Sequence, residues 1–320
     1  MIRAPQTVLK PESADRPQVS WEEAACPLCQ SRHSSPLIEA QDCAAASDGL
    51  WFAVVQCDSC GMCFTNPRPD PASIGQFYPS DYSPHAPRPE RRVRSFWSSL
   101  KYWNRPRVEK RPIPWHGQGR LLDFGCGNGA YMQMMHRRGW QVTGLDVSER
   151  MVEHIRNDLG LNAYVGSLPH LDLEPESFDV ITMWHSLEHI HEPLPLLREA
   201  QSLLATGGKI VISVPNIDSW PFRWFGRNWF ALELPRHLNQ FMPSTLGEML
   251  ERAGFAVEPI QMVRHCDWIR YSARLACQRL QPMLWQKALT YKWPARLAGL
   301  WCYLAEQSDC ILAVGYRREN

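Results

Sequence analysis

The sequence lacks several features that would mark a protein as exported, membrane-spanning or nucleic-acid-binding. Its 320 residues include no basic segment followed by an apolar run, as a secretion signal would, and no apolar run long enough to cross a bilayer. The formal net charge is only +1, so the chain as a whole has no signature of polyanion binding. Internal repeats and low-complexity tracts are also absent from the sequence. We therefore expect a cytoplasmic globular protein, long enough for one full α/β domain and a smaller appendage.

Cysteine, in contrast, is abundant, with 11 residues, and in a cytoplasmic protein these are not expected to form a disulfide framework. Two Cys-x-x-Cys pairs flank a predicted hairpin that includes a strand at 50–55, and Gly61 permits a tight turn after the second pair. Four thiolates from two such turns can converge on one tetrahedral ion. The pattern predicts a structural zinc ribbon, and the alternative is a set of buried, unlinked cysteines. The predicted ligands are Cys26, Cys29, Cys57 and Cys60, and either Cys43 or Cys63 can replace one of them.

The central stretch of the sequence runs from residue 121 to residue 129. An apolar run ends in Asp123 and is followed by glycines at positions 125, 127 and 129. A parallel strand that turns sharply into a helix needs residues that accept positive φ and let a ligand approach the backbone. A second predicted strand, 141–146, ends in Asp146, whose carboxylate can accept hydrogen bonds from both hydroxyls of a ribose. The Gly-x-Gly-x-Gly spacing differs from the Gly-x-Gly-x-x-Gly that suits a dinucleotide pyrophosphate.

Hydrophobic periodicity extends the α/β pattern along the chain. The strand predicted at 178–184 is a continuous apolar run, which is typical of a central parallel strand buried on both faces. A helix is predicted at 196–204, and the glycine pair at 207–208 is predicted to stop it. About 45 residues separate the strand predicted to end at 263 from the last strand. The apolar residues in this connection recur at helical spacing, which predicts helices. Further strands are predicted at 162–166, 209–214, 255–263 and 310–315, and helices at 128–138, 148–159, 196–204 and 243–254.

The order of these motifs resembles the class I S-adenosylmethionine-dependent methyltransferases. The resemblance begins with Asp-x-Gly-x-Gly-x-Gly and Asp146, covers roughly 119–263, and continues through 177–183, 186–189, 204–211 and 235–237. It implies an α/β fold with a Rossmann-like seven-stranded methyltransferase sheet, here with a small N-terminal zinc ribbon and a helical insertion before the last strand. With the ribbon and the linking segments 64–69 and 77–82, the chain is similar to bacterial enzymes that methylate sugars, glycans and natural products.

The resemblance also implies which residues hold S-adenosylmethionine. Ser167 and Leu168 lie where the adenine edge is read, and Ser167 stands where many relatives carry an acid. Tyr78 and Tyr82 approach the cofactor or the acceptor in such enzymes, and the alternative is that they pack the linker onto the core. The predicted cofactor residues are Asp123, Phe124, Gly125, Cys126, Gly127, Gly129, Asp146, Val147, Ser167, Leu168, Trp184 and Tyr82.

Four residues after the central strands are candidates for the chemistry at the acceptor. Methyl transfer requires in-line placement of the acceptor, and a hydroxyl or amine acceptor also requires a base. Histidine has a suitable pKa, and a histidine here can alternatively orient a loop. Arg236 is predicted to clamp an anionic group. The candidates are His189, His185, His237 and Glu188.

The sequence therefore predicts a methyltransferase that acts on a small or carrier-linked acceptor. A sugar or polyketide-like hydroxyl ranks first, and a quinone-type phenol ranks second. An RNA methyltransferase that uses the ribbon is an alternative, but the low net charge and the absence of Asn-Pro-Pro-Tyr-like residues after 178–184 argue against it. A non-catalytic cofactor-binding scaffold is another, and the intact Asp123, glycine turn and Asp146 argue against that.

Charge is unevenly distributed along the chain. Segment 88–111 has nine Lys/Arg and two Glu, and segment 264–296 has seven Lys/Arg and one Asp, so both are strongly basic, with aromatic residues interleaved. We expect the two segments to share one face and to meet an anionic, partly apolar partner such as the inner membrane face, and the alternative is a solvated surface. The predicted division of the chain is a tail at 1–20, the ribbon at 21–70, linker and lid helices at 71–118, the core at 119–263, a helical insertion at 264–308 and the last strand at 309–320.

Overall fold

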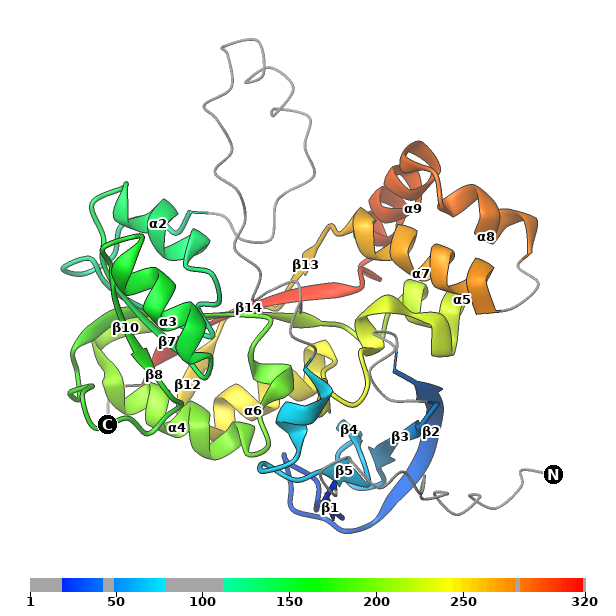
Figure 1. The fold of residues 1–320 in the computed structure, drawn as a ribbon, viewed down its shortest axis with the longest axis horizontal. Coiled ribbons are helices and arrows are strands. Elements are labelled where there is room, and N and C mark those ends of the chain that lie inside the picture. Colours follow the sequence, from blue (N-terminus) through cyan, green and yellow to red (C-terminus); the bar gives the residue numbers. More distant parts are fainter. Residues whose placement is uncertain (1–18, 43–48, 79–111, 280–282, 319–320) are drawn as a thin grey trace.

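The computed structural model describes residues 19–42, 49–78, 112–279 and 283–318. Figure 1 shows a central α/β sheet, a group of N-terminal strands beside it and a helical lobe next to the start of β14 (Cys310–Arg317). Predictions for the tail before residue 19, for Cys43, for Tyr82 and for the basic segment 88–111 lie outside the described residues.

Within the described ranges the central sheet has eight strands, and seven of them follow the order β12–β14–β10–β9–β6–β7–β8. The five strands from β10 to β8 in this order are parallel, whereas β14 is antiparallel to β10. The carboxyl ends of the parallel strands meet at one edge, where ligands bind in open α/β sheets. The predicted Rossmann-like fold class is confirmed. The parallel strands are β6 (Arg120–Phe124), β7 (Gln141–Asp146), β8 (Asn162–Val165), β9 (Phe178–Trp184) and β10 (Leu204–Pro215).

Helices cover both faces of this sheet. On one face lie α2 (Ala130–His136) and α3 (Glu149–Asn157), and on the other lie α4 (Pro193–Leu203) and α6 (Pro243–Arg252). The strands serve both layers because neighbouring side chains alternate between faces. Leu121 packs with the α2 and α3 layer, and Leu122 packs with the α4 and α6 layer. The sheet is therefore buried on both faces, and its strand ends are left for ligands.

Two boundaries in the core differ from the sequence-based prediction. The strand predicted at 255–263 is divided into β12 (Phe255–Val257) and β13 (Gln261–Val263), and both pair with β14, which raises the strand count from seven to eight. The helix predicted to end at the glycine pair already ends at Leu203. Pairing of Leu204 with β9 starts β10 there, and the glycines lie at an irregular register within that strand. Strand pairing overrode the local helix-stop signal.

The N-terminal strands form a ribbon whose sheet includes a strand of the core. β2 (Ser34–Gln41), β3 (Trp51–Cys57) and β4 (Cys63–Thr65) are antiparallel neighbours. β11 (Asn239–Gln240), from the loop that follows β10 and α5, pairs with β4 and completes this sheet. A separate two-stranded sheet joins β1 (Trp21–Glu22) to β5 (Arg68–Pro69). Leu28, Met62 and Phe64 also share the core that underlies α4 and α6. The ribbon is thus joined to the core by hydrogen bonds and by packing.

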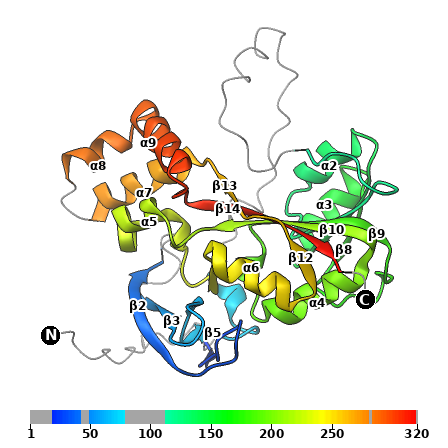
Figure 2. The same cartoon turned by 180° about the vertical axis from the view of Figure 1, so that it is seen from behind.

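Helices fill the connection between β13 and β14, as predicted, and its described residues form three of them. They are α7 (Cys266–Arg279), α8 (Leu284–Leu289) and α9 (Lys292–Leu304). With α5 (Trp220–Phe225) they form a lobe that Figures 1 and 2 show on the opposite side of the molecule from α2 and α3. Among the described residues, no helix has both the length and the apolar character needed to cross a membrane. Short 3₁₀ turns occupy Ile74–Phe77, Leu187–His189, Gly226–Asn228 and Phe230–Leu232.

Candidate functional site

The carboxylate of Asp146, at the end of β7, is fixed by the backbone of two loops. Its Oδ2 accepts a hydrogen bond from the Gly127 N–H at 2.8 Å, and its Oδ1 accepts one from the Ser148 N–H at 2.9 Å. An ionised carboxylate has about four lone-pair sites, so both oxygens can accept further donors. The group is therefore held in one orientation while keeping the capacity to receive two hydroxyls.

The glycine turn after β6 leaves no room for a side chain at Gly125. Gly125 has a φ of +69°, and a Cβ atom added there would lie 2.5 Å from Ser186 Oγ. That hydroxyl donates to the Phe124 carbonyl at 2.9 Å, so the turn and the loop after β9 are tied together. Bare backbone at the edge where strands end is the surface that lets a ligand approach closely. The turn therefore fits the bound cofactor that the sequence predicts.

The other predicted cofactor residues lie on the same strand ends. Asp123 is buried and accepts a hydrogen bond from Thr182 Oγ1 at 2.7 Å. Val147 is 72% exposed directly after Asp146 and offers an apolar surface there. Ser167 is half-buried after β8. Their contacts with a cofactor stay predictions, as do those of the buried residues Phe124, Cys126, Leu168 and Trp184.

The loop after β9 brings His185 and Glu188 together. His185 has a φ of +55°, a left-handed conformation that side chains seldom adopt outside turns and functional sites. Its Nδ1 lies 3.1 Å from Glu188 Oε1. An ionised carboxylate can only accept, so Nδ1 carries the proton, and the lone pair of the neutral ring is on Nε2.

Glu188 is charged although its side chain is only 1% exposed. Burial acts to raise the pKa of Glu188, but the hydrogen bond from His185 and the charges that His185, His237 and His189 carry when protonated outweigh burial and lower that pKa. Its Oε2 has no hydrogen-bond partner within the described part of the chain. A buried anion that holds the far nitrogen of a histidine orients that ring and favours proton uptake at the near nitrogen.

His189 differs from His185 because protein surrounds it and a second histidine lies beside it. Its Nδ1 is 3.0 Å from the Tyr78 hydroxyl and 3.0 Å from the Arg236 carbonyl oxygen. Burial and the charge of the adjacent His237 lower the pKa of His189 to about 4. His189 is therefore neutral near pH 7 and can position a hydroxyl, but it is a weak base.

Stability at mild acid pH should report this environment. Above the ordinary pKa of 6.5, His189 is neutral in both the folded and the unfolded chain and contributes no pH dependence. As the pH falls from 6.5 toward 4, the unfolded chain binds a proton that the folded protein does not bind. The free energy of unfolding should therefore fall by about 2 kcal/mol more in the wild type than in His189→Gln between about pH 8 and about pH 5. Urea unfolding measures this. An equal fall in both proteins would contradict the lowered pKa, and the exposed-site variant His136→Gln should keep the full dependence.

His237 is held in place by neighbouring groups. Its Nδ1 lies 2.8 Å from the Ala231 carbonyl oxygen, and its Nε2 lies 3.6 Å from Glu233 Oε2. One ligand atom of each of Glu188, His189 and His237 falls within 4.8 Å of the others. All four candidates for the chemistry are therefore brought into one cluster by the loops after β9 and β10.

Arg236 does not have the role predicted from the sequence. Its side chain is fully buried and forms a paired contact with Asp42, at 2.7 and 3.0 Å. It also bonds Glu233 Oε1 at 3.1 Å and the Phe77 carbonyl oxygen at 2.8 Å. A guanidinium with these partners is committed to folding and cannot clamp an anionic acceptor. It holds the loop that carries His237 against the ribbon.

Four residues in this region were missed or left open by the sequence analysis. Tyr78 contacts His189, which favours the proposal that this tyrosine belongs to the acceptor side over mere packing of a linker. Asp42 and Glu233 are acidic residues with no local motif, and only the fold brings them to Arg236. Adjacent to His185 lies Trp268, the first aromatic residue of α7, with ring centroids 5.0 Å apart. The helical insertion thus reaches the same site.

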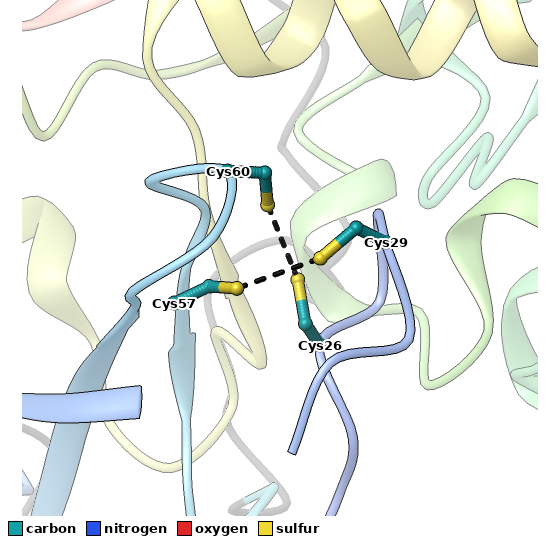
Figure 3. Close-up of side chains that lie close together, drawn as sticks. All are labelled: Cys26, Cys29, Cys57 and Cys60. Carbon is teal, nitrogen blue, oxygen red and sulfur yellow. Dashed lines mark hydrogen bonds between the residues drawn. The ribbon is translucent and has the colours of Figure 1, made fainter. Parts of the chain in front are cut away.

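The four predicted zinc ligands converge at the tip of the ribbon (Figure 3). Cys26 and Cys60 have sulfur atoms 3.5 Å apart, as do Cys29 and Cys57. Backbone N–H groups of the same turns bond the sulfur atoms of Cys26 and Cys57. Cys63 is buried outside this group, with its sulfur 3.6 Å from the Gly61 carbonyl oxygen. The cluster is able to hold one metal ion.

The chain is similar in sequence to known methyltransferases. A family described as a methyltransferase domain matches residues 90–260, just over half of the chain. The ubiquinone biosynthesis O-methyltransferase of Xanthomonas euvesicatoria pv. vesicatoria (strain 85-10) is 33% identical over 169 residues, which are 49% of this chain and 70% of that protein. The protein of the same name from Stutzerimonas stutzeri (strain A1501) is 31% identical over 153 residues, 44% of this chain and 66% of that protein. An S-adenosylmethionine-dependent methyltransferase structure from Mesorhizobium loti has 22% identity and a TM-score of 0.44, over 69% of this chain and 97% of that one. The protein belongs to the methyltransferase-domain family, and its prediction as an S-adenosylmethionine-dependent methyltransferase is confirmed.

Proposed function

We propose that the protein methylates a phenolic hydroxyl, with His185 as general base and Glu188 as the group that orients it. The observation that carries the proposal is the 3.1 Å contact between His185 Nδ1 and the buried carboxylate of Glu188. S-adenosylmethionine, when bound, supplies an electrophilic methyl group. His185 Nε2 takes the proton of the hydroxyl, and the charge that forms on the ring is stabilised by the anionic Glu188.

The environments of the three histidines support His185 over the other two. The pKa of His189 is lowered to about 4, which makes it a poor proton acceptor near neutral pH. His237 is 4% exposed and has neighbours at both ring nitrogens, so it serves to shape the loop. His185 directly follows β9 at the edge where the strands end, and 23% of its side chain is exposed, although its Nε2 atom is buried. We assign His189 and Tyr78 to positioning of the acceptor.

The acidity of the acceptor favours a phenol over an aliphatic hydroxyl. A phenol has a pKa of about 10 and an aliphatic alcohol is far less acidic, so a phenol gives up its proton to imidazole more readily. Trp268 beside His185 and Tyr78 beside His189 provide aromatic surface for a ring. Two relatives described above are named as ubiquinone biosynthesis O-methyltransferases. The sugar hydroxyl that the sequence ranks first becomes the second candidate.

We further infer that the ribbon holds a structural zinc ion. Tetrahedral Zn–S bonds of about 2.3 Å separate neighbouring sulfur atoms by about 3.8 Å, close to the 3.5 Å found within each of the two pairs. Four cysteines complete the coordination sphere and leave no position for a reactive water. Because β11 pairs with β4, the ion would also support the loop that carries His237.

The cofactor side of the proposal is tested by Asp146→Ala. Loss of the carboxylate should remove two charge-assisted hydrogen bonds to the ribose, roughly 2–4 kcal/mol, and weaken S-adenosylmethionine binding by about 30- to 1,000-fold. Isothermal titration calorimetry measures the affinity. Asp172→Ala, which removes an exposed carboxylate, serves as the control and should leave the affinity for S-adenosylmethionine unchanged. Unaltered affinity in a folded Asp146→Ala protein would overturn the ribose assignment.

A further inference from the structure

The outer face of α9 is apolar although it faces solvent. Trp293, Leu297, Trp301 and Leu304 recur at helical spacing and are 71%, 67%, 60% and 71% exposed. The opposite face is also apolar, since Ala295, Gly299 and Cys302 are buried in the core that includes α7. A surface helix normally pairs one apolar face with a polar one. Most of the apolar outer face of α9 is therefore left uncovered by the rest of the lobe.

Neighbouring elements extend this face into a continuous surface. Leu284 and Trp285 of α8 are exposed, as is Tyr291 between the two helices. The Trp301 ring lies 4.8 Å from that of Trp220 on α5, and the Trp285 ring lies 6.3 Å from that of Trp224. We name this the lobe surface, defined by Leu284, Trp285, Trp293, Leu297, Trp301 and Leu304. Figures 1 and 2 both show α8 and α9 on the outside of the molecule, away from the ribbon.

The segment that contains α7, α8 and α9 is basic. From residue 266 to residue 304 the sequence has six Lys/Arg and one acidic residue, Asp267. Lys287 and Lys292 are exposed on α8 and at the start of α9. The Arg296 guanidinium lies 5.3 Å from the centre of the Trp293 ring, which places charge directly beside the exposed aromatic face.

We propose that the lobe surface docks on a bilayer that contains anionic phospholipids. Helices that lie at the headgroup boundary of a bilayer are typically rich in tryptophan, tyrosine and leucine, with lysine and arginine beside them. A second copy of this chain is a poorer occupant, since it would bring two clusters of like charge together. The helices are too short to span the bilayer, so the contact is peripheral.

The lobe surface is connected to the candidate active site by α7. Trp268, in the first turn of α7, contacts His185, and α7 also packs against α9 through Ile269 and Gly299. Docking would thus hold the acceptor site close to a bilayer that dissolves apolar substrates. This connection rests on the proposed function, whereas docking itself does not.

Vesicle sedimentation of the full chain tests the docking, without cofactor or acceptor. Vesicles of mixed phosphatidylglycerol and phosphatidylcholine should pull the protein down at low salt and release it at high salt, and pure phosphatidylcholine should bind it weakly. Trp293→Ala/Leu297→Ala should lower binding by about tenfold or more, because it removes apolar surface that the bilayer would bury. Both side chains are exposed, so the substitutions leave the fold intact. Lys287→Glu/Lys292→Glu should reduce the preference for anionic vesicles. Leu171→Ala, at a fully exposed leucine outside the lobe, is the matched control and should bind as the wild type does.

Two results would overturn the proposal. One is an absence of binding to anionic vesicles at low salt, or binding that Trp293→Ala/Leu297→Ala leaves unchanged. The other is a concentration-dependent dimer in analytical ultracentrifugation that the same variant dissociates, which would assign the lobe surface to a second copy of the chain. Neither result depends on methyl transfer, so failure of docking is distinguishable from failure of the proposed function.

Discussion

His185→Asn should lower the rate of methyl transfer by about 100- to 10,000-fold while S-adenosylmethionine binds with unchanged affinity. The substitution removes the only atom proposed to take the proton of the hydroxyl, and it leaves the cofactor residues at the ends of β6 and β7 in place. Asparagine is chosen because it tolerates the φ of +55° at this position better than most residues. Initial rates with a soluble catechol and saturating S-adenosylmethionine measure the effect.

Two comparisons separate a base from a residue that merely supports the loop. His136→Asn, on the exposed face of α2, is the matched control and should transfer methyl groups at the wild-type rate. Glu188→Gln keeps the shape of the side chain but removes the negative charge beside His185. It should therefore lower the rate and shift the limb of the pH–rate profile in which the rate rises with pH. A His185→Asn enzyme with wild-type turnover would assign the base to another group.

Loss of the ribbon metal should abolish methyl transfer even though the thiol cluster lies outside the active site. Metal analysis should return about one zinc ion per chain in the wild type and none in Cys57→Ser. The free energy of unfolding should fall by several kcal/mol, since structural zinc binding is worth on the order of 10 kcal/mol. Elemental analysis, thermal unfolding and the catechol assay on the same samples measure all three.

The expected loss of activity follows from the contacts between the ribbon and the loop of His237. Thr65 of β4 donates its hydroxyl to the His237 carbonyl at 2.7 Å and its N–H to the Leu238 carbonyl at 2.9 Å. Cys63→Ser and Cys277→Ser should both retain the ion, because neither sulfur belongs to the cluster. Full activity in a zinc-free protein would contradict this coupling. Retention of metal by Cys60→Ser together with its loss from Cys63→Ser would show that the ligand set is wrong by one residue.

The parts of the fold that sequence predicts well are those with local causes. The glycines at 125, 127 and 129 all adopt positive φ, as the sharp turn between β6 and α2 requires. Asp146 ends β7, and its contact with Gly127 follows from the adjacency of two parallel strands. The Cys-x-x-Cys pairs predict their own convergence, because each turn holds two thiols on one side.

Other features depend on contacts between distant segments, which no local pattern encodes. Arg236 pairs with Asp42, 194 residues away, and this partner reverses the role predicted for the arginine. Tyr78 meets His189 across 111 residues. The pairing of β11 with β4 makes the ribbon part of the core, whereas the spacing of cysteines predicts only a separate module. The distinct environments of His185 and His189, four residues apart, likewise arise from burial and from partners that the fold supplies.

The most direct test of the account is to identify the product formed from a catechol in the presence of S-adenosylmethionine with an isotope-labelled methyl group. Mass spectrometry and NMR of the product establish whether the label has moved and to which atom. We predict a methyl ether that carries the label on one phenolic oxygen, formed by the wild type and nearly absent with His185→Asn. A label on carbon or nitrogen, or transfer to a sugar hydroxyl with none to the catechol, would contradict the proposal.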